Sequence, residues 1–153
     1  MIICYLFLIF EKKLRMKKIN EIHDILTYSA DALSLIEMVR KGINYSSYLP
    51  IFEKSSINIQ EWAHILQVSE RTIQRHKKEN ISFKPLQSEK ILQIAFLIDK
   101  GQEVFGDNTK FSQWLGAECL ALGGNKPKEL LDNFFGIQLI ENELEKIQHG
   151  IFA

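Results

Sequence analysis

The 153-residue sequence contains little cysteine and has no excess of charge of either sign. Its two cysteines, Cys4 and Cys119, form no CxxC pair and have no histidine pair nearby, which argues against a disulfide framework and against a zinc site. Because 19 basic residues balance 19 acidic residues, the whole chain does not attract a polyanion. Any nucleic-acid binding must therefore come from a local basic surface.

The sequence also lacks an apolar run long enough to cross a membrane. The N-terminal run MIICYLFLIF has ten residues, whereas a membrane-spanning helix needs about 20. Basic residues follow this run, where a secretory signal would place them before it. We interpret residues 1–18 as an extension that is not native or is disordered, with Met16 as the true start; an interfacial anchor or a buried strand are the alternatives. We expect a cytoplasmic protein with no membrane partner.

The charges are unevenly distributed along the chain. Residues 1–100 contain 15 Lys and Arg against 11 Asp and Glu, whereas residues 101–153 contain 4 against 8. The acidic C-terminal third is therefore not expected to contact phosphates, and a basic surface is expected before it.

Apolar residues recur at helical spacing from residue 31 onward, and no segment keeps the alternation of a strand. Helices are expected at about 31–42, 47–54, 59–66, 70–79, 85–105, 108–116, 127–134 and 137–150. The segment after Pro85 is apolar nearly all round, which indicates the central core helix. The predicted fold is all-α, with a helical domain at 19–105 that contains a helix-turn-helix at 59–79, and a second small helical domain at 106–153.

Local signals set several of these helix starts. Asn58 and Glu61 have the spacing of a capping box, and Ser69 is a good N-cap for the next helix. Pro50 is expected in the first turn of the helix at 47–54, where proline is acceptable, and Pro85 at the first position of the central helix.

The stretch LQVSERTIQRH, residues 66–76, has the pattern of a helix-turn-helix. Ala63 is the small residue needed where two helices cross, Val68 is the apolar residue of the turn, and Ile73 faces inward. The turn usually carries a left-handed glycine, and here Gln67 occupies that position at a strain of about 1 kcal/mol. The predicted DNA-binding residues are Ser69, Glu70, Arg71, Thr72, Gln74, Arg75, Lys77 and Lys78.

These residue types suit the two parts of DNA recognition. In the first turns of such a helix, Arg can pair with guanine and Gln with adenine. Lys77 and Lys78 are better placed for phosphates, which set affinity and register. The alternative is a helical hairpin that belongs to the core, with its basic residues merely solvated.

No pattern in the sequence indicates catalysis, a cofactor or a metal. The four histidines are scattered singly, and Gly123-Gly124 is not a phosphate loop because neither a strand nor a GK[ST] sequence adjoins it. We therefore do not expect an enzyme.

The C-terminal 40 residues resemble the toxin-binding domain of the Xre/MbcA/ParS-like antitoxins. The shared elements, in order, are Trp114-Leu115, the loop Ala121-Leu122-Gly123-Gly124 with Pro127, Leu130-Leu131 with Gly136, and a closing helix from Leu144 to Gly150 followed by Ile151. The family also has an Xre-like helix-turn-helix upstream, with an R-T-[IL]-x-R run that matches residues 71–75. The resemblance covers about residues 30–153.

This resemblance implies a function and partners. A typical member binds and blocks a RES-domain toxin from the same operon that depletes NAD, and represses the operon through operator DNA. We also expect a homodimer. The alternative is a free-standing transcription regulator whose C-terminal unit mediates dimerisation.

We expect the toxin-binding surface at the end of the last helix and in the apolar tail beyond it. The predicted residues are Glu141, Glu145, Gln148, His149, Gly150, Ile151, Phe152 and Ala153. Glu141 and Glu145 lie on one helical face and could instead be a solvated surface, and the tail could fold back on its own domain. Trp114, Leu122 and Leu131 are expected in the core.

Overall fold

The computed structural model describes residues 32–150, so the predicted extension at 1–18 and the last three residues lie outside the described part. The elements are α3 (Ala32–Lys41), α4 (Tyr45–Ser55), α5 (Ile59–Ile65), α6 (Glu70–Glu79), α7 (Pro85–Phe105), α8 (Asn108–Gly116), the 3₁₀ turns η1 (Leu120–Leu122) and η2 (Pro127–Leu130), and α9 (Phe134–Gln148). Residues 32–150 contain no strand, which confirms the all-α fold.

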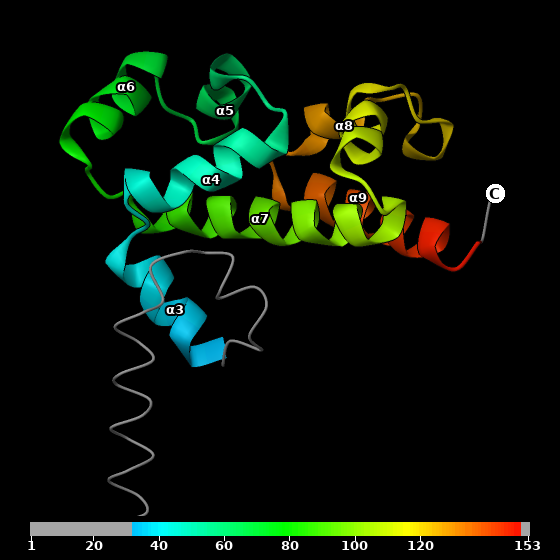
Figure 1. Ribbon diagram of the computed structural model, residues 1–153, viewed down its shortest axis with the longest axis horizontal. Coiled ribbons are helices and arrows are strands. Elements are labelled where there is room, and N and C mark those ends of the chain that lie inside the picture. The colour runs from blue at the N-terminus through cyan, green and yellow to red at the C-terminus, as the bar shows by residue number, and fades with distance from the viewer. Residues whose placement is uncertain (1–31, 151–153) are drawn as a thin grey trace, which may run out of the picture.

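Helix α7 is the central element of the structure (Figure 1). Its 21 residues contact α3, α4, α8 and α9. Pro85 occupies the first turn as predicted, and Gly106 ends the helix in the left-handed conformation at φ 68°. The buried residues Ile91, Ile94 and Leu97 show why the sequence of this segment is apolar nearly all round. Both halves of the chain thus pack against one continuous helix.

An aromatic cluster fills the core beneath the helix-turn-helix. The ring of Tyr48 lies 5.1 Å from those of Trp62 and Phe83, in edge-on contacts. The indole N–H of Trp62 donates to the Ser55 hydroxyl over 3.1 Å. These contacts hold α5 on α4, and α5 in turn supports α6.

The buried side chain of Ser88, near the start of α7, links two segments: the one before α4, at Ile43, and the one before α7, at Phe83. Its hydroxyl accepts the Ile43 N–H over 2.9 Å and donates to the Phe83 carbonyl over 3.2 Å. The Phe83 N–H donates to the Ile43 carbonyl over 2.7 Å. This network satisfies buried backbone groups that no helix could satisfy.

Three predicted helices differ from the structure. Asn44 caps α4 by accepting the Ser47 N–H, so the helix begins at Tyr45 and Pro50 lies inside it, beyond the first turn. The helix expected at 127–134 is only the short turn η2. Asn133 accepts the Gly136 N–H over 2.9 Å and so starts α9 at Phe134, earlier than the expected residue 137.

None of the helices within residues 32–150 combines the length and the apolar character that a bilayer-spanning segment requires.

Candidate functional site

The turn between α5 and α6 has the geometry that the sequence predicts. Gln67 adopts the left-handed conformation at φ 53°, and its N–H donates to the His64 carbonyl over 3.1 Å. The next N–H, of Val68, donates to the Ala63 carbonyl over 2.9 Å. Ser69 then caps α6 by accepting the Thr72 N–H over 3.1 Å. The reversal of the chain therefore requires the unusual conformation of Gln67.

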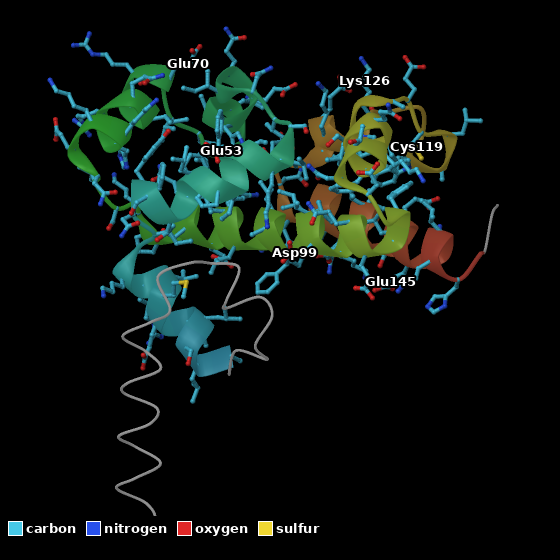
Figure 2. All side chains as sticks on the ribbon, viewed as in Figure 1. Glu53, Glu70, Asp99, Cys119, Lys126 and Glu145 are labelled. Carbon is cyan, nitrogen blue, oxygen red and sulfur yellow. The ribbon has the colours of Figure 1, made fainter. Side chains whose placement is uncertain are left out.

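Helix α6 divides cleanly into an inner and an outer face. Ile73 and His76 are buried against the core, and the small Ala63 is buried on α5. Six predicted DNA-binding residues are exposed on the outer face: Glu70, Arg71, Gln74, Arg75, Lys77 and Lys78. Figure 2 shows Glu70 at the N-terminal end of α6, on the outside of the molecule. The structure thus gathers these six side chains on one accessible helix.

The other two predicted residues, Ser69 and Thr72, lie at the N-terminal cap of α6. The hydroxyls of Ser69 and Thr72 lie 2.9 Å apart in a hydrogen bond, and Thr72 is half-buried. Both side chains therefore define the first turn of α6, where a capping hydroxyl satisfies free backbone N–H groups.

The outer face of α6 carries basic groups that are open to an anionic partner. Within residues 32–150, no acidic side chain forms an ion pair with Arg71, Arg75, Lys77 or Lys78. Such groups can neutralise phosphates without first breaking an internal ion pair. Although the chain is neutral overall, this helix presents a local positive surface.

Replacing Gln67 by glycine is expected to raise the free energy of unfolding by as much as about 1 kcal/mol. Glycine adopts positive φ without the steric cost that an L-residue incurs, although its more flexible unfolded state offsets part of the gain. Gln67→Ala keeps the Cβ and serves as the control, with no gain expected. Urea unfolding of both variants measures the difference, and equal stability of the glycine variant and wild type would show that the turn is unstrained.

His76 packs the end of α6 against the segment before α7. Its ring stacks on Phe83 at 4.5 Å, and its Nδ1 lies 3.2 Å from the Ile81 carbonyl oxygen. Burial lowers the pKa of His76 below the usual 6.5; the bond to Ile81 acts in the opposite direction, and the charge of nearby Arg75 adds to the lowering. The folded protein therefore favours the neutral imidazole.

This shift predicts a loss of stability in mild acid. The unfolded chain protonates His76 near pH 6.5, whereas the folded chain resists protonation, so protons favour unfolding as the pH falls through 6.5. His76→Phe retains the ring contact with Phe83 and should make this pH dependence shallower. Urea unfolding at a series of pH values tests the expectation, and equal slopes for the variant and wild type would contradict it.

The C-terminal unit is built around a glycine loop. Gly123 and Gly124 have φ of 68° and 81°, and the Gly124 N–H donates to the Cys119 carbonyl over 2.9 Å. The Asn125 side chain closes the loop by donating to the Leu122 carbonyl over 2.8 Å. Leu122 and Leu131 are buried, as predicted, whereas Trp114 is half-buried and packs against Phe105 and Phe111.

The predicted toxin-binding residues do not form one uniform surface. Glu145, labelled in Figure 2, accepts from the Lys100 ammonium over 2.6 Å, and this hydrogen bond and charge lower the pKa of its carboxyl. Glu141 is half-buried. Gln148, His149 and Gly150 are exposed at the end of α9, and Ile151, Phe152 and Ala153 lie outside the described residues.

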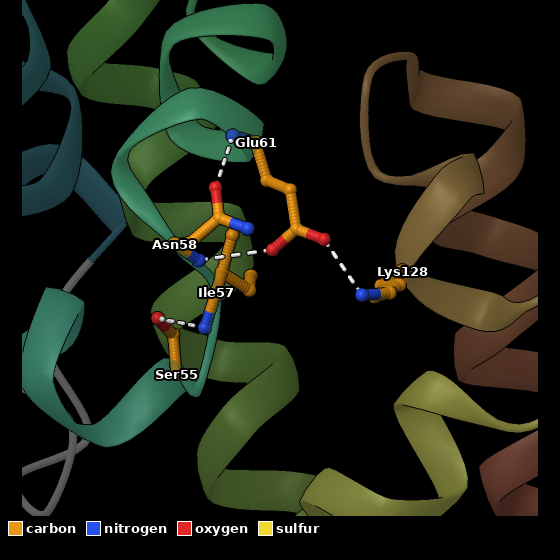
Figure 3. A network of polar contacts seen from close by, with 5 residues as sticks. All are labelled: Ser55, Ile57, Asn58, Glu61 and Lys128. Atoms are coloured by element: carbon orange, nitrogen blue, oxygen red, sulfur yellow. Dashed lines mark hydrogen bonds and ion pairs between the residues drawn. The ribbon is translucent and has the colours of Figure 1, made fainter. Parts of the chain in front are cut away.

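A polar bridge connects the two halves of the chain (Figure 3). Local sequence patterns did not indicate this bridge. Glu61 completes the predicted capping box by accepting the Asn58 N–H over 2.9 Å, and its other oxygen accepts from Lys128 over 2.6 Å. Burial alone would raise the pKa of Glu61, but its bonds to Lys128 and Asn58 and the Lys128 charge lower it overall. Nearby, His64 Nε2 and Asp132 Oδ2 are 3.8 Å apart.

The fold and the exposed basic face of α6 define a helix-turn-helix protein with an additional helical unit. Among residues 32–150, no group of three or more His, Cys, Asp or Glu side chains has an arrangement that could hold a metal ion. Residues 34–95 match the antitoxin Xre-like helix-turn-helix domain, and residues 100–150 match the antitoxin Xre/MbcA/ParS C-terminal toxin-binding domain. The two matched segments therefore correspond to both domains of an Xre/MbcA/ParS-type antitoxin.

Two relatives are similar along most of the chain. A protein named antitoxin Xre, from Yersinia enterocolitica, is 23% identical over 120 residues, which cover 78% of this chain and 81% of the relative. A protein named Prs ADP-ribosylating antitoxin, from a Sphingobium species, is 25% identical over 135 residues, which cover 82% of this chain and 85% of the relative. Both similarities extend across the two family domains.

Proposed function

We propose that this protein neutralises a co-encoded RES-type toxin that depletes NAD, and that it represses its own operon by binding operator DNA. The observation that carries the proposal is the pairing of an exposed basic α6 with a unit of the toxin-binding family on one shared helix, α7. Because DNA and the NAD pool are both cytoplasmic, we also propose that the protein acts in the cytoplasm.

The DNA-binding part of the proposal assigns α6 to the major groove. Arg71 and Arg75 are the proposed partners of guanine, Gln74 of adenine, and Lys77 and Lys78 of phosphates. We further propose a homodimer, because two copies related by a two-fold axis would read two half-sites about 34 Å apart.

The toxin-binding part of the proposal assigns the partner to the end of α9 and the tail that follows. Gln148, His149 and Gly150 are exposed there, and the acidic C-terminal third would repel DNA rather than compete for it. The name of the Sphingobium relative refers to ADP-ribosylation, a reaction that consumes NAD. That name supports a partner that acts on NAD.

The test is co-expression with the product of the neighbouring toxin gene, with growth, cellular NAD and co-purification as measurements. The full chain should restore growth and NAD and should co-purify with the toxin. A version lacking residues 149–153 should lose the rescue. The cut belongs after residue 148 because Leu144 is wholly buried and Glu145 pairs with Lys100, so a longer deletion would damage the fold itself.

Three outcomes separate the alternatives. If the full chain neither rescues growth nor co-purifies, the antitoxin function is wrong. If, in addition, loss of the C-terminal unit converts a dimer to a monomer, the free-standing regulator is the better description. If the version without residues 149–153 still rescues, the toxin is bound elsewhere on the unit.

A further inference from the structure

Large apolar side chains are exposed together at the start of α9. Phe134, Phe135 and Leu139 are 52%, 74% and 52% exposed. The other exposed large hydrophobic residues among residues 32–150 are divided among α3, α7 and the glycine loop: Leu33, Ile36, Leu86, Phe96 and Leu120. We refer to Phe134, Phe135 and Leu139 as the α9 patch.

The fold itself keeps the α9 patch facing outward. Gly136, Ile137 and Ile140 are buried on the opposite side of α9. Asn133 fixes the first turn by accepting the Gly136 N–H, and Gly136 lies so close to the Leu130 carbonyl that even a Cβ would collide with it. The helix therefore cannot rotate to bury Phe135 without losing this contact. The α9 patch is not needed to complete the core.

The composition of this surface is that of an interface centre. Residues 134–140, FFGIQLI, include no charged residue, and the rings of Phe134 and Phe135 contact each other at 5.7 Å. Interface centres are depleted in charge and enriched in aromatic residues.

The α9 patch is continuous with the proposed toxin contacts at the other end of the helix. Phe135, Leu139, Asn142 and Lys146 are separated by four, three and four residues, so they follow one another along one face. At 1.5 Å per residue, this face extends about 20 Å from Phe135 to His149. It therefore leads from the α9 patch to the exposed end of the chain.

We propose that the α9 patch is the apolar centre of the toxin-binding surface, inserted into an apolar pocket of the toxin. The inference rests on the proposed function and adds residues and a partner chemistry to it. All three residues lie within 100–150, the segment that matches the toxin-binding domain. The α9 patch exposes on the order of 300 Å², less than the roughly 800 Å² per partner of a stable interface. The exposed outer face of α9 supplies further contacts to the toxin, so the α9 patch is the centre of a larger surface.

The test is the affinity of the full chain for the purified, catalytically inactivated product of the neighbouring toxin gene, measured by calorimetry. Phe135→Gln combined with Leu139→Gln should weaken binding about 100-fold or more, because buried apolar anchors dominate interface energies. Gln is a good helix former, so α9 should remain intact. Leu86→Gln and Leu120→Gln, at sites 80% and 94% exposed, are the controls and should change the affinity less than about threefold.

Folding and oligomeric state are measured on the same variants. Unchanged operator affinity and an unchanged unfolding midpoint show that the double variant is folded. If the double variant is not folded, the single variants Phe135→Gln and Leu139→Gln replace it. Each single variant should lose about tenfold or more in toxin affinity. Toxin binding by the double variant that equals that of wild type overturns the inference alone. The inference is also overturned if wild type is a dimer and the double variant is a monomer that still binds the toxin, because a second copy then occupies the α9 patch. A wild type that does not bind the toxin overturns the proposed function instead.

Discussion

Simultaneous replacement of Arg71 and Arg75 by alanine is expected to reduce affinity for the operator at least about 100-fold and to leave toxin binding unchanged. The two guanidinium groups are exposed, lie four residues apart on α6, and form no ion pair within residues 32–150. A bidentate contact to a base contributes about 1–3 kcal/mol, so losing two of them exceeds a hundredfold at the middle of that range. Fluorescence anisotropy at one fixed salt concentration measures the change.

The controls separate base contacts from general electrostatics. Lys77→Ala with Lys78→Ala should weaken binding to all sequences alike and make the dependence on salt shallower, because phosphate contacts carry no sequence information. Lys110→Ala, at an exposed position of α8, should have no effect. If operator affinity does not change when Arg71 and Arg75 are replaced, α6 is not the reading helix and the helix-turn-helix has only a structural role.

Gly136→Ala is expected to lower the free energy of unfolding by about 3 kcal/mol, the upper part of the range for overpacking a core. The added Cβ would collide with the backbone carbonyl of Leu130, and a backbone atom cannot move aside as the end of a side chain can. Either η2 or the first turn of α9 would have to shift. Since α9 packs on both α7 and η2, the strain would spread through the C-terminal unit.

A second glycine supplies a matched control for this prediction. A Cβ added at Gly116, in the last turn of α8, would point into open space with no packed neighbour within 4 Å, so Gly116→Ala should be neutral or stabilising by up to about 1 kcal/mol. Urea unfolding followed by circular dichroism gives both values. Equal midpoints for Gly136→Ala and wild type would mean that α9 and η2 are not in close backbone contact.

Local sequence signals predicted much of the helix-turn-helix because their physical causes are local. The Asn58–Glu61 capping box, the Ser69 cap and Pro85 at the start of α7 each depend on residues within one turn. The predicted start of α4 was wrong because two local signals compete there. Pro50 suggested a start at residue 47, but the Asn44 cap determines where the helix begins.

Contacts between distant residues could not be predicted in this way. Glu61 and Lys128 are 67 positions apart. The residues next to Glu61 in the sequence predict its part in the capping box, but they do not predict its bond to Lys128. Helical periodicity also treats every apolar residue as a candidate for the core, so Phe135 and Leu139 gave no sign that they face outward. Their orientation depends on the Asn133 cap and on the close approach of Gly136 to Leu130.

The continuity of α7 fixes the angular register between the two proposed binding surfaces. The matched family segments meet between residues 95 and 100, inside this helix, where Leu97 and Ile98 are buried. One residue inserted there would turn everything beyond it by about 100° and move it by about 1.5 Å. A chimera that joins the helix-turn-helix of one family member to the C-terminal unit of another therefore has to preserve helix length across the junction, or the toxin would be presented at a different angle to the DNA.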